Sequence, residues 1–329
     1  MSQPSLFRSL LLRVVVAGLL IGALYSGVRY GLPATGAAVG VSLAVGFFAL
    51  ERFVLRRNAG GVFRPLPFLT YLALRSALYV GVIVLAIALA SRLLSGGFAG
   101  VRGVDFLFSV ALVIGANLLL SVNDLLGPGV LFAFAAGRYY RPRIEERALL
   151  FIDMRASTAI AERLGEVRFL DLLNRFVADL SLAVAEAGGE IHKYVGDEVI
   201  ATWRLAPGEN GPACVRACFA ALDRLRAQEP AYQRDFGRPA DFRAALHCGP
   251  VAVGELGTLK REIALIGDAM NAAARILEAC RTEDKRVLAS ASLLNRLAPL
   301  PTGITRRRLG ELAVRGKQHV LELYALEKS

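Results

Sequence analysis

The sequence has few of the residues that build zinc, haem or disulfide sites. It contains only four cysteines and three histidines in 329 residues. No two cysteines form a C-x-x-C pair, so a zinc site is not expected, and free thiols suit a reducing cytoplasmic compartment. All three histidines follow residue 191, so the part before it cannot supply a pair of histidine ligands to haem. These residues are Cys214, Cys218, Cys248, Cys280, His192, His247 and His319.

Three common catalytic motifs are also absent. The chain has no G-x-x-x-x-G-K-[ST] phosphate loop, no H-E-x-x-H zinc helix and no G-x-S-x-G nucleophile turn. Readings as a P-loop enzyme, a zinc protease or a serine hydrolase therefore have no support. The net charge of +11 does not indicate a nucleic-acid partner, because arginines flank the apolar runs and no basic patch is interleaved with aromatic residues.

Hydrophobic residues make up 55% of the chain, and the long apolar runs lie almost entirely within residues 1–135. Four of these runs approach the roughly 20 helical residues that cross a bilayer core of about 30 Å. They are approximately Leu10–Tyr30, Thr35–Leu55, Phe68–Ala90 and Phe106–Leu126. We therefore expect residues 1–127 to form an all-α membrane bundle of four transmembrane helices, with membrane lipid as a partner.

The distribution of arginines predicts the orientation of this bundle. Basic residues are concentrated in the link 51–65 and in the segment 137–147, whereas the link after the first run carries no charge. Cytoplasmic loops carry an excess of Lys and Arg, so both termini are expected on the cytoplasmic side of the inner (plasma) membrane. A Gly-Pro-Gly sequence at 127–129 ends the fourth run, and residues 128–147 are predicted to be a coupling segment.

Residues 148–329 have the mixed composition of an α+β domain, with helices packed on a mainly antiparallel sheet. Glycines mark the ends of several expected elements, and a turn at Gly249-Pro250 is expected to join the two strands of one hairpin. The expected elements are a strand at 148–154, a helix at 157–188, a hairpin at 190–203, a helix at 213–228, a hairpin at 242–257, a helix at 270–280, a strand at 286–290 and strands at 306–317 and 321–326.

Two aspartates, 44 positions apart, each follow an apolar, strand-like run. Asp153 lies in FIDMRAST (151–158), and Asp197 lies in HKYVGDEVIATW (192–203). Hard divalent cations such as Mg²⁺ bind to a few carboxylate oxygens together with substrate phosphates. Strands that bring one carboxylate each to a common point would therefore form a divalent-metal site.

Several motifs in order resemble the class III adenylate/guanylate cyclase family, membrane-anchored bacterial type. The resemblance covers residues 148–326 and rests on FIDMRAST, on the hairpin with Asp197, on FRAALHCGPVAVGELG (242–257) and on ALIGDAMNAAARI (264–276). It implies a cyclase catalytic domain with a ferredoxin-like βαββαβ core that converts ATP to 3′,5′-cyclic AMP and pyrophosphate. It also implies two Mg²⁺ or Mn²⁺ ions per site, held by Asp153, Asp197 and the main chain at Met154.

The resemblance implies roles for further residues. Asn271 and Arg275 are four positions apart, on one face of a helix; Asn271 would orient the ribose, and Arg275 would stabilise charge on the α-phosphate. Thr158, near the start of a helix, is expected at the phosphates. Arg315, with Lys317 nearby, would hold the terminal phosphates.

Base recognition departs from the family pattern. Lys193 is implied to donate to a ring acceptor of adenine, but Ala264 stands where the family has Asp or Thr. Because alanine cannot form a side-chain hydrogen bond, base selectivity could be looser, or another group could serve. ATP is the expected substrate, with guanylate or dual-specificity cyclase activity as the alternative.

The family places its sites between two catalytic domains, and one copy in this chain implies a homodimer. Two other readings were weighed. A diguanylate cyclase is disfavoured because Val195 precedes Gly196 and Val199 replaces the phenylalanine of that family's hairpin. A non-catalytic membrane receptor with a degenerate cyclase domain is supported only by Ala264.

Overall fold

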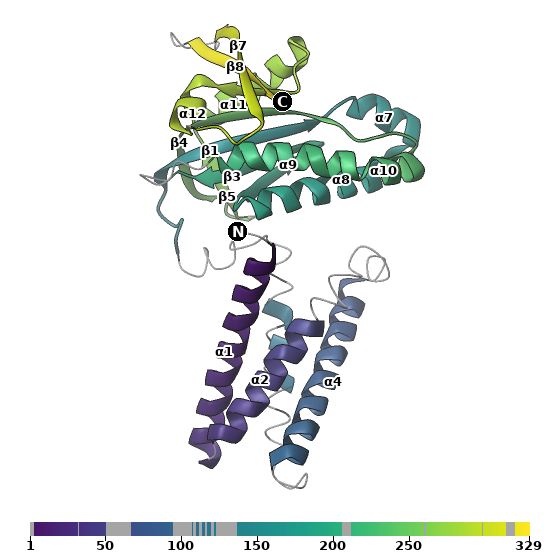
Figure 1. Cartoon of the computed structure of the whole chain (residues 1–329), viewed down its shortest axis with the longest axis vertical. Helices are drawn as coiled ribbons and strands as arrows, with labels where there is room; N and C mark the ends of the chain where they lie inside the picture. The colour runs from purple at the N-terminus through teal and green to yellow at the C-terminus, as the bar shows by residue number, and fades with distance from the viewer. Residues whose placement is uncertain are drawn as a thin grey trace. The chain divides into compact units, whose positions relative to one another are not determined.

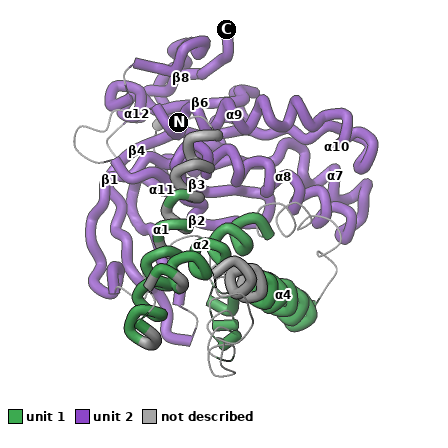
Figure 2. The backbone as a smooth tube through the Cα atoms, turned by 60° about the horizontal axis from the view of Figure 1, so that its bottom comes forward, with its two compact units in different colours: residues 1–126 green, residues 127–329 purple. Residues whose placement is uncertain are grey.

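The computed structural model describes residues 3–31, 33–50, 67–94, 137–205, 212–259, 261–297, 299–313 and 320–329, with isolated positions between 107 and 122. The chain divides into two compact units, residues 1–126 and 127–329 (Figure 2). The coupling segment predicted at 128–147 falls within the second unit, and its last residues already belong to a strand.

The first unit contains helices α1 (Gln3–Tyr30), α2 (Pro33–Ala49) and α4 (Phe68–Leu94). Among the described residues, no helix is both long and apolar enough to cross a membrane. The predicted bundle of four transmembrane helices is therefore not supported, and most of its fourth run lies outside the described residues.

Close packing between α1 and α2 depends on glycine. A Cβ atom added at Gly22 would collide with the carbonyl oxygen of Gly36, and one added at Gly18 would collide with that of Gly40. The small residues spaced four apart in each helix therefore let the two backbones approach closely.

The second unit folds around a single sheet. Its elements are β1 (Arg143–Met154), α7 (Ser157–Leu164), α8 (Glu166–Glu186), β2 (Glu190–Val195), β3 (Glu198–Arg204), α9 (Ala213–Ala227), α10 (Glu229–Phe236), β4 (Phe242–Leu256), β5 (Glu262–Ile266), α11 (Asp268–Thr282), β6 (Val287–Ser290), α12 (Ala291–Arg296), β7 (Ile304–Ala313) and β8 (Val320–Lys328). The strand order is β2-β3-β1-β4-β6-β8-β7, and β5 pairs with β4. The first four strands and their helices form the predicted βαββαβ core, and the parallel β4–β6 pair makes the sheet mixed. The α+β prediction is confirmed.

Helices cover both faces of this sheet (Figure 1). Helices α8 and α9 lie side by side on one face, whereas α11 packs on the other. The central strand β1 has side chains in both cores: Leu150 and Ile152 face α8, and Leu149 and Phe151 face α11. Burial on both faces explains why residues 148–154 of β1 are a nearly continuous apolar run.

Two predicted elements differ from the structure. The single helix expected at 157–188 is broken at Gly165, whose φ of +76° lies in the region that favours glycine. The hairpin expected at 242–257 is instead one continuous strand, β4, which pairs with β1 along its length. On its other side, β6 pairs only with residues 244–246 and β5 only with residues 252–256. Pro250 thus lies where one side of β4 forms no sheet hydrogen bonds, so its missing N–H is tolerated.

A buried histidine predicts a pH dependence of stability. His247 is 7% exposed, its Nδ1 lies 2.8 Å from Ser290 Oγ, and burial lowers its pKa to about 4. Between the ordinary value and about pH 4, the unfolded chain binds a proton that the folded chain does not, so stability falls as the pH decreases.

Replacing His247 with Gln should therefore reduce the slope of unfolding free energy against pH between 6.5 and 4, by at most about 1.4 kcal/mol per pH unit. Some slope should remain, because burial also lowers the pKa of His192 to about 4. The measurement is denaturant unfolding followed by the fluorescence of Trp203, the only tryptophan in the chain and a buried residue of β3. Identical slopes in the two proteins would refute this assignment.

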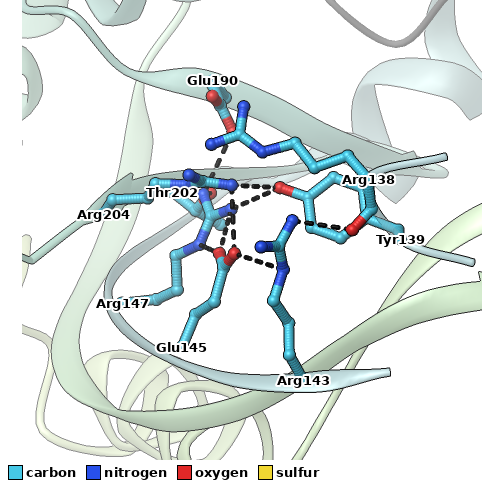
Figure 3. Close-up of polar contacts among 8 residues, drawn as sticks. All are labelled: Arg138, Tyr139, Arg143, Glu145, Arg147, Glu190, Thr202 and Arg204. Carbon is cyan, nitrogen blue, oxygen red and sulfur yellow. Dashed lines mark hydrogen bonds and ion pairs between the residues drawn. The ribbon is translucent and has the colours of Figure 1, made fainter. Parts of the chain in front are cut away.

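A polar network connects the start of β1 with the β2–β3 hairpin (Figure 3). At its centre, the guanidinium of Arg147 is buried and donates to Glu145 at 2.8 Å and to Glu190 and Thr202 at 3.0 Å each. Burial alone would lower the pKa of Arg147, but its hydrogen bonds and charge interactions with Glu190 and Glu145 outweigh burial and raise it. The hydroxyl of Tyr139 accepts from Arg147 and Arg204, so the residues before β1 are tied to the hairpin.

Candidate functional site

Three carboxylates gather where β1 meets the β2–β3 hairpin. Asp153 lies at the end of β1, directly opposite Glu198 of β3 in the register. Asp197 occupies the two-residue turn between β2 and β3 beside Gly196, whose φ of +63° fits a tight hairpin turn. The structure therefore brings the two predicted aspartates to one place and adds Glu198, which sequence reasoning did not single out.

Burial and neighbouring charge raise the pKa of two of these acids, Asp153 and Glu198. Asp153 is only 4% exposed, and burial raises the pKa of its carboxyl above the ordinary value, with the charge of Asp197 adding to the effect. Burial and the charges of Asp153 and Asp197 likewise raise the pKa of Glu198. Within the described residues, no group of three or more His, Cys, Asp or Glu side chains is arranged to hold a metal ion.

An arginine that sequence reasoning missed contacts this cluster. Arg281, near the end of α11, places Nη2 2.7 Å from Oδ1 of Asp153. This ion pair partly opposes the effect of burial on the pKa of Asp153. No local sequence pattern signals the contact, because it forms only when α11 packs across the sheet.

The backbone after Asp153 leads directly into α7. Met154 is buried, and Ala156, at the N-cap position, has a φ of +57°, which is uncommon for a residue other than glycine. No side chain caps the first N–H groups of α7. Thr158 is exposed in the first turn of this helix. The predicted phosphate-binding segment is thus a helix N-terminus beside the carboxylates.

A second group of predicted residues involves β2, β5 and α11. Lys193 on β2 forms an ion pair with Glu262 on β5, with 3.1 Å between Nζ and Oε1. Ala264 is on β5, paired with Gly254. On α11, Asn271 is exposed and Arg275 is partly buried. The predicted phosphate contacts Arg315 and Lys317 lie outside the described residues.

The family described as the adenylate and guanylate cyclase catalytic domain matches residues 139–328. "Adenylate cyclase 2" of Rhizobium meliloti (strain 1021) is 33% identical over 332 residues, which cover 98% of this chain and 91% of that protein. The "Adenylate cyclase" of Anabaena cylindrica is 28% identical over 185 residues, which cover 54% of this chain and 36% of that one.

A solved structure of a bacterial light-regulated adenylyl cyclase has the same fold, with a TM-score of 0.57 and 21% sequence identity. The match covers 69% of this chain and 66% of that one. The fold and the family match define a class of enzyme, the nucleotide cyclases. This chain belongs to the adenylate and guanylate cyclase family.

Proposed function

We propose that this chain is an adenylate cyclase, which converts ATP to 3′,5′-cyclic AMP and pyrophosphate at sites shared by two copies of the chain. The relative from Rhizobium meliloti, similar over almost the whole chain, carries the name of an adenylate cyclase. Lys193, at the position implied to recognise the base, is a donor and suits a ring acceptor of adenine.

The proposal of a shared site rests on the distance along α11 between Asn271 and Arg281. Arg281 contacts Asp153, whereas Asn271 lies ten residues earlier on the same helix. Ten helical residues rise about 15 Å, which is more than an asparagine side chain can bridge. This separation favours a site in which Asp153 and Asn271 come from different chains, so that a second copy would supply the missing half.

Exposed apolar side chains near both groups would suit such a dimer. Tyr194 and Val195 precede the turn with Asp197 and are 49% and 52% exposed. Leu256, at the end of β4, and Ile266, at the end of β5, are 51% and 60% exposed. Burial of these four side chains between two copies would remove apolar surface from water. In a two-fold arrangement, each copy would contribute these four side chains to the interface, and two equivalent sites would form.

Asp153 and Asp197 offer two carboxylates to a divalent cation, which would take its other ligands from the main chain, water and substrate phosphates. Burial and the charge of Asp197 raise the pKa of Asp153, and burial and the charges of Asp153 and Asp197 raise that of Glu198; a cation would relieve this repulsion. Asp153 and Asp197, with the main chain at Met154, are the proposed ligands for Mg²⁺ or Mn²⁺, two ions per site. When bound, the ions would supply Lewis-acid activation of the ribose hydroxyl and charge neutralisation at the phosphates.

The remaining residues would position the substrate. The uncapped N–H groups at the start of α7, with Thr158, would bind phosphate oxygens. Asn271 would orient the ribose so that its 3′-oxygen points at the α-phosphorus. Arg275 would stabilise the negative charge that develops there, an effect that commonly amounts to about 3 kcal/mol. Arg315 and Lys317 stay predicted contacts of the terminal phosphates.

Mixing inactive variants tests the shared site. Purified Asp153→Ala and Asn271→Ala chains should each be inactive alone, and a mixture should recover up to about a quarter of the wild-type rate. Random pairing makes half of the dimers mixed, and each mixed dimer has one intact site of two. Cyclic AMP and pyrophosphate are measured with ATP, and GTP is run in parallel. Failure of the mixture to recover activity, with dimers present, would refute the shared site.

A location at the inner (plasma) membrane, with both termini in the cytoplasm, stays a prediction from the apolar runs and the arginine distribution. Fractionation of cells that express the full chain, with and without a carbonate wash, tests it. Recovery of the chain in the soluble fraction would contradict it.

A further inference from the structure

We infer that Glu198 is a positioning residue: it accepts the guanidinium of Arg281 when Asp153 binds a divalent cation. The inference rests on the proposed function, because Asp153 must be a ligand of that cation. Arg281 contacts Asp153 where the cation would bind, with Nη2 2.7 Å from Oδ1. The arginine therefore has to leave Asp153 before the cation can occupy this place, and the proposed function names no residue that receives it.

Asp153 and Glu198 are neighbours on one face of the sheet. They are directly opposite each other in the antiparallel register of β1 and β3, where Cβ atoms are about 5 Å apart. Side chains alternate along a strand, so Asp153 shares the face of Phe151, and Glu198 shares that of Ile200. Phe151 and Ile200 both belong to the core on the side of α11, the helix that carries Arg281. Both carboxylates therefore lie on the side from which the arginine approaches.

The exchange requires only a rotation of the Arg281 side chain. This side chain is 56% exposed, and exposed side chains change rotamer within picoseconds to nanoseconds. The two carboxylates are cross-strand neighbours, so the guanidinium moves by no more than a few ångströms. Its contact with Asp153 is made through Nη2, whereas a guanidinium has five N–H donors. Arg281 can therefore approach Glu198 without a change in the fold.

Glu198 is suited to receive this charge. Within the described part of the chain, its carboxylate forms no ion pair or side-chain hydrogen bond. Burial and the charge of Asp153 raise the pKa of Glu198, whereas the charge of Arg281 lowers it. Arg281 thus stabilises the ionised form of Glu198 even from its place on Asp153. A guanidinium that moves closer to Glu198 would stabilise it further.

The balance of charges favours the exchange. Arg281 holds Asp153 by one contact, and ion pairs with a half-exposed partner contribute little net free energy. A divalent cation carries twice the charge of the guanidinium and replaces it on the aspartate. An arginine left beside the cation would repel it, but the charge of Glu198 offsets this repulsion. Glu198 therefore keeps Arg281 in the site and away from Asp153.

A double-substitution cycle in the full-length protein tests the exchange. The probe is Mn²⁺ without nucleotide, and electron paramagnetic resonance measures the free ion. Glu198→Gln should weaken Mn²⁺ binding by about tenfold in the wild-type background but by at most about threefold in Arg281→Gln. The smaller factor is the general effect of one lost negative charge, and the excess is the loss of the acceptor. Arg281→Lys should keep most of this excess, because an ammonium can also pair with Glu198.

Glu278→Gln is the matched control, because Glu278 is exposed on α11 three residues before Arg281 and is a second carboxylate within its reach. It should change Mn²⁺ affinity by less than about twofold in both backgrounds. Equal effects of Glu198→Gln in the two backgrounds would refute the role of Glu198, and so would an excess shown by Glu278→Gln instead.

The outcome for the proposed function is separate. A wild-type chain that binds no Mn²⁺, or that binds it equally well after Asp153→Ala, would refute the proposed metal site itself. Unfolding followed by Trp203 fluorescence shows whether each variant is folded.

Discussion

Replacing Asp153 with asparagine should lower the rate of cyclic AMP formation by about 1,000-fold. The substitution keeps the shape of the side chain but removes the charge at the buried end of β1, where the proposed cations would bind. Charge stabilisation by such ions contributes several kcal/mol to the transition state, and about 1.4 kcal/mol corresponds to each factor of ten in rate. The measurement is the initial rate with ATP at saturating Mg²⁺ and, separately, Mn²⁺.

Folding should survive this substitution. Because the pKa of Asp153 is raised, its charged form destabilises the folded domain relative to the unfolded chain. A neutral amide removes this destabilisation. The unfolding midpoint, followed by Trp203 fluorescence, should therefore not decrease. A variant that keeps more than a tenth of the wild-type rate would contradict the assignment of Asp153 as a metal ligand.

Arg281→Gln is the control at the same place. The Arg281 side chain is 56% exposed, so its removal should cost little stability. Its positive charge competes with a cation for Asp153, and the Mg²⁺ concentration that gives half the maximal rate should fall several-fold in the variant. A rate as low as that of Asp153→Asn would show that Arg281 does more than compete.

Replacing Arg147 with alanine should lower the free energy of unfolding of the second unit by about 3 kcal/mol. Removal of one partner of a buried ion pair typically costs about 3–5 kcal/mol. The lower end applies because Glu145 keeps ion pairs with Arg143 at 3.3 Å and with Arg204 at 3.0 Å. Arg147→Lys should recover little of the loss, because an ammonium cannot reproduce the forked donors that reach Glu145, Glu190 and Thr202 together.

Arg143→Ala is the matched control, because its side chain is 42% exposed and pairs with the same Glu145. This substitution should lower the free energy of unfolding by at most about 1 kcal/mol. Both variants are measured by denaturant unfolding with Trp203 as the probe. Equal losses in the two variants would contradict the central role of Arg147 in the network.

Much of the second unit was predictable because its signals are local. The apolar run before Asp153 predicts a strand, and Gly196 next to Asp197 predicts a hairpin turn, since both depend on residues close in the chain. The helix break at Gly165 and the continuity of β4 through Pro250 were not predicted. Pro250 is acceptable in β4 because one side of the strand has no neighbour at that point. A local sequence pattern cannot show this absence.

The amino-acid sequence by itself determined the α+β class, the order of the elements and the positions of Asp153 and Asp197 at strand ends, because periodicity and turn residues act over short distances. Only the tertiary structure decided which distant groups meet. It placed Arg281 against Asp153 and Glu262 against Lys193. These contacts depend on how α11 and β5 pack against the sheet, which no run of neighbouring residues encodes.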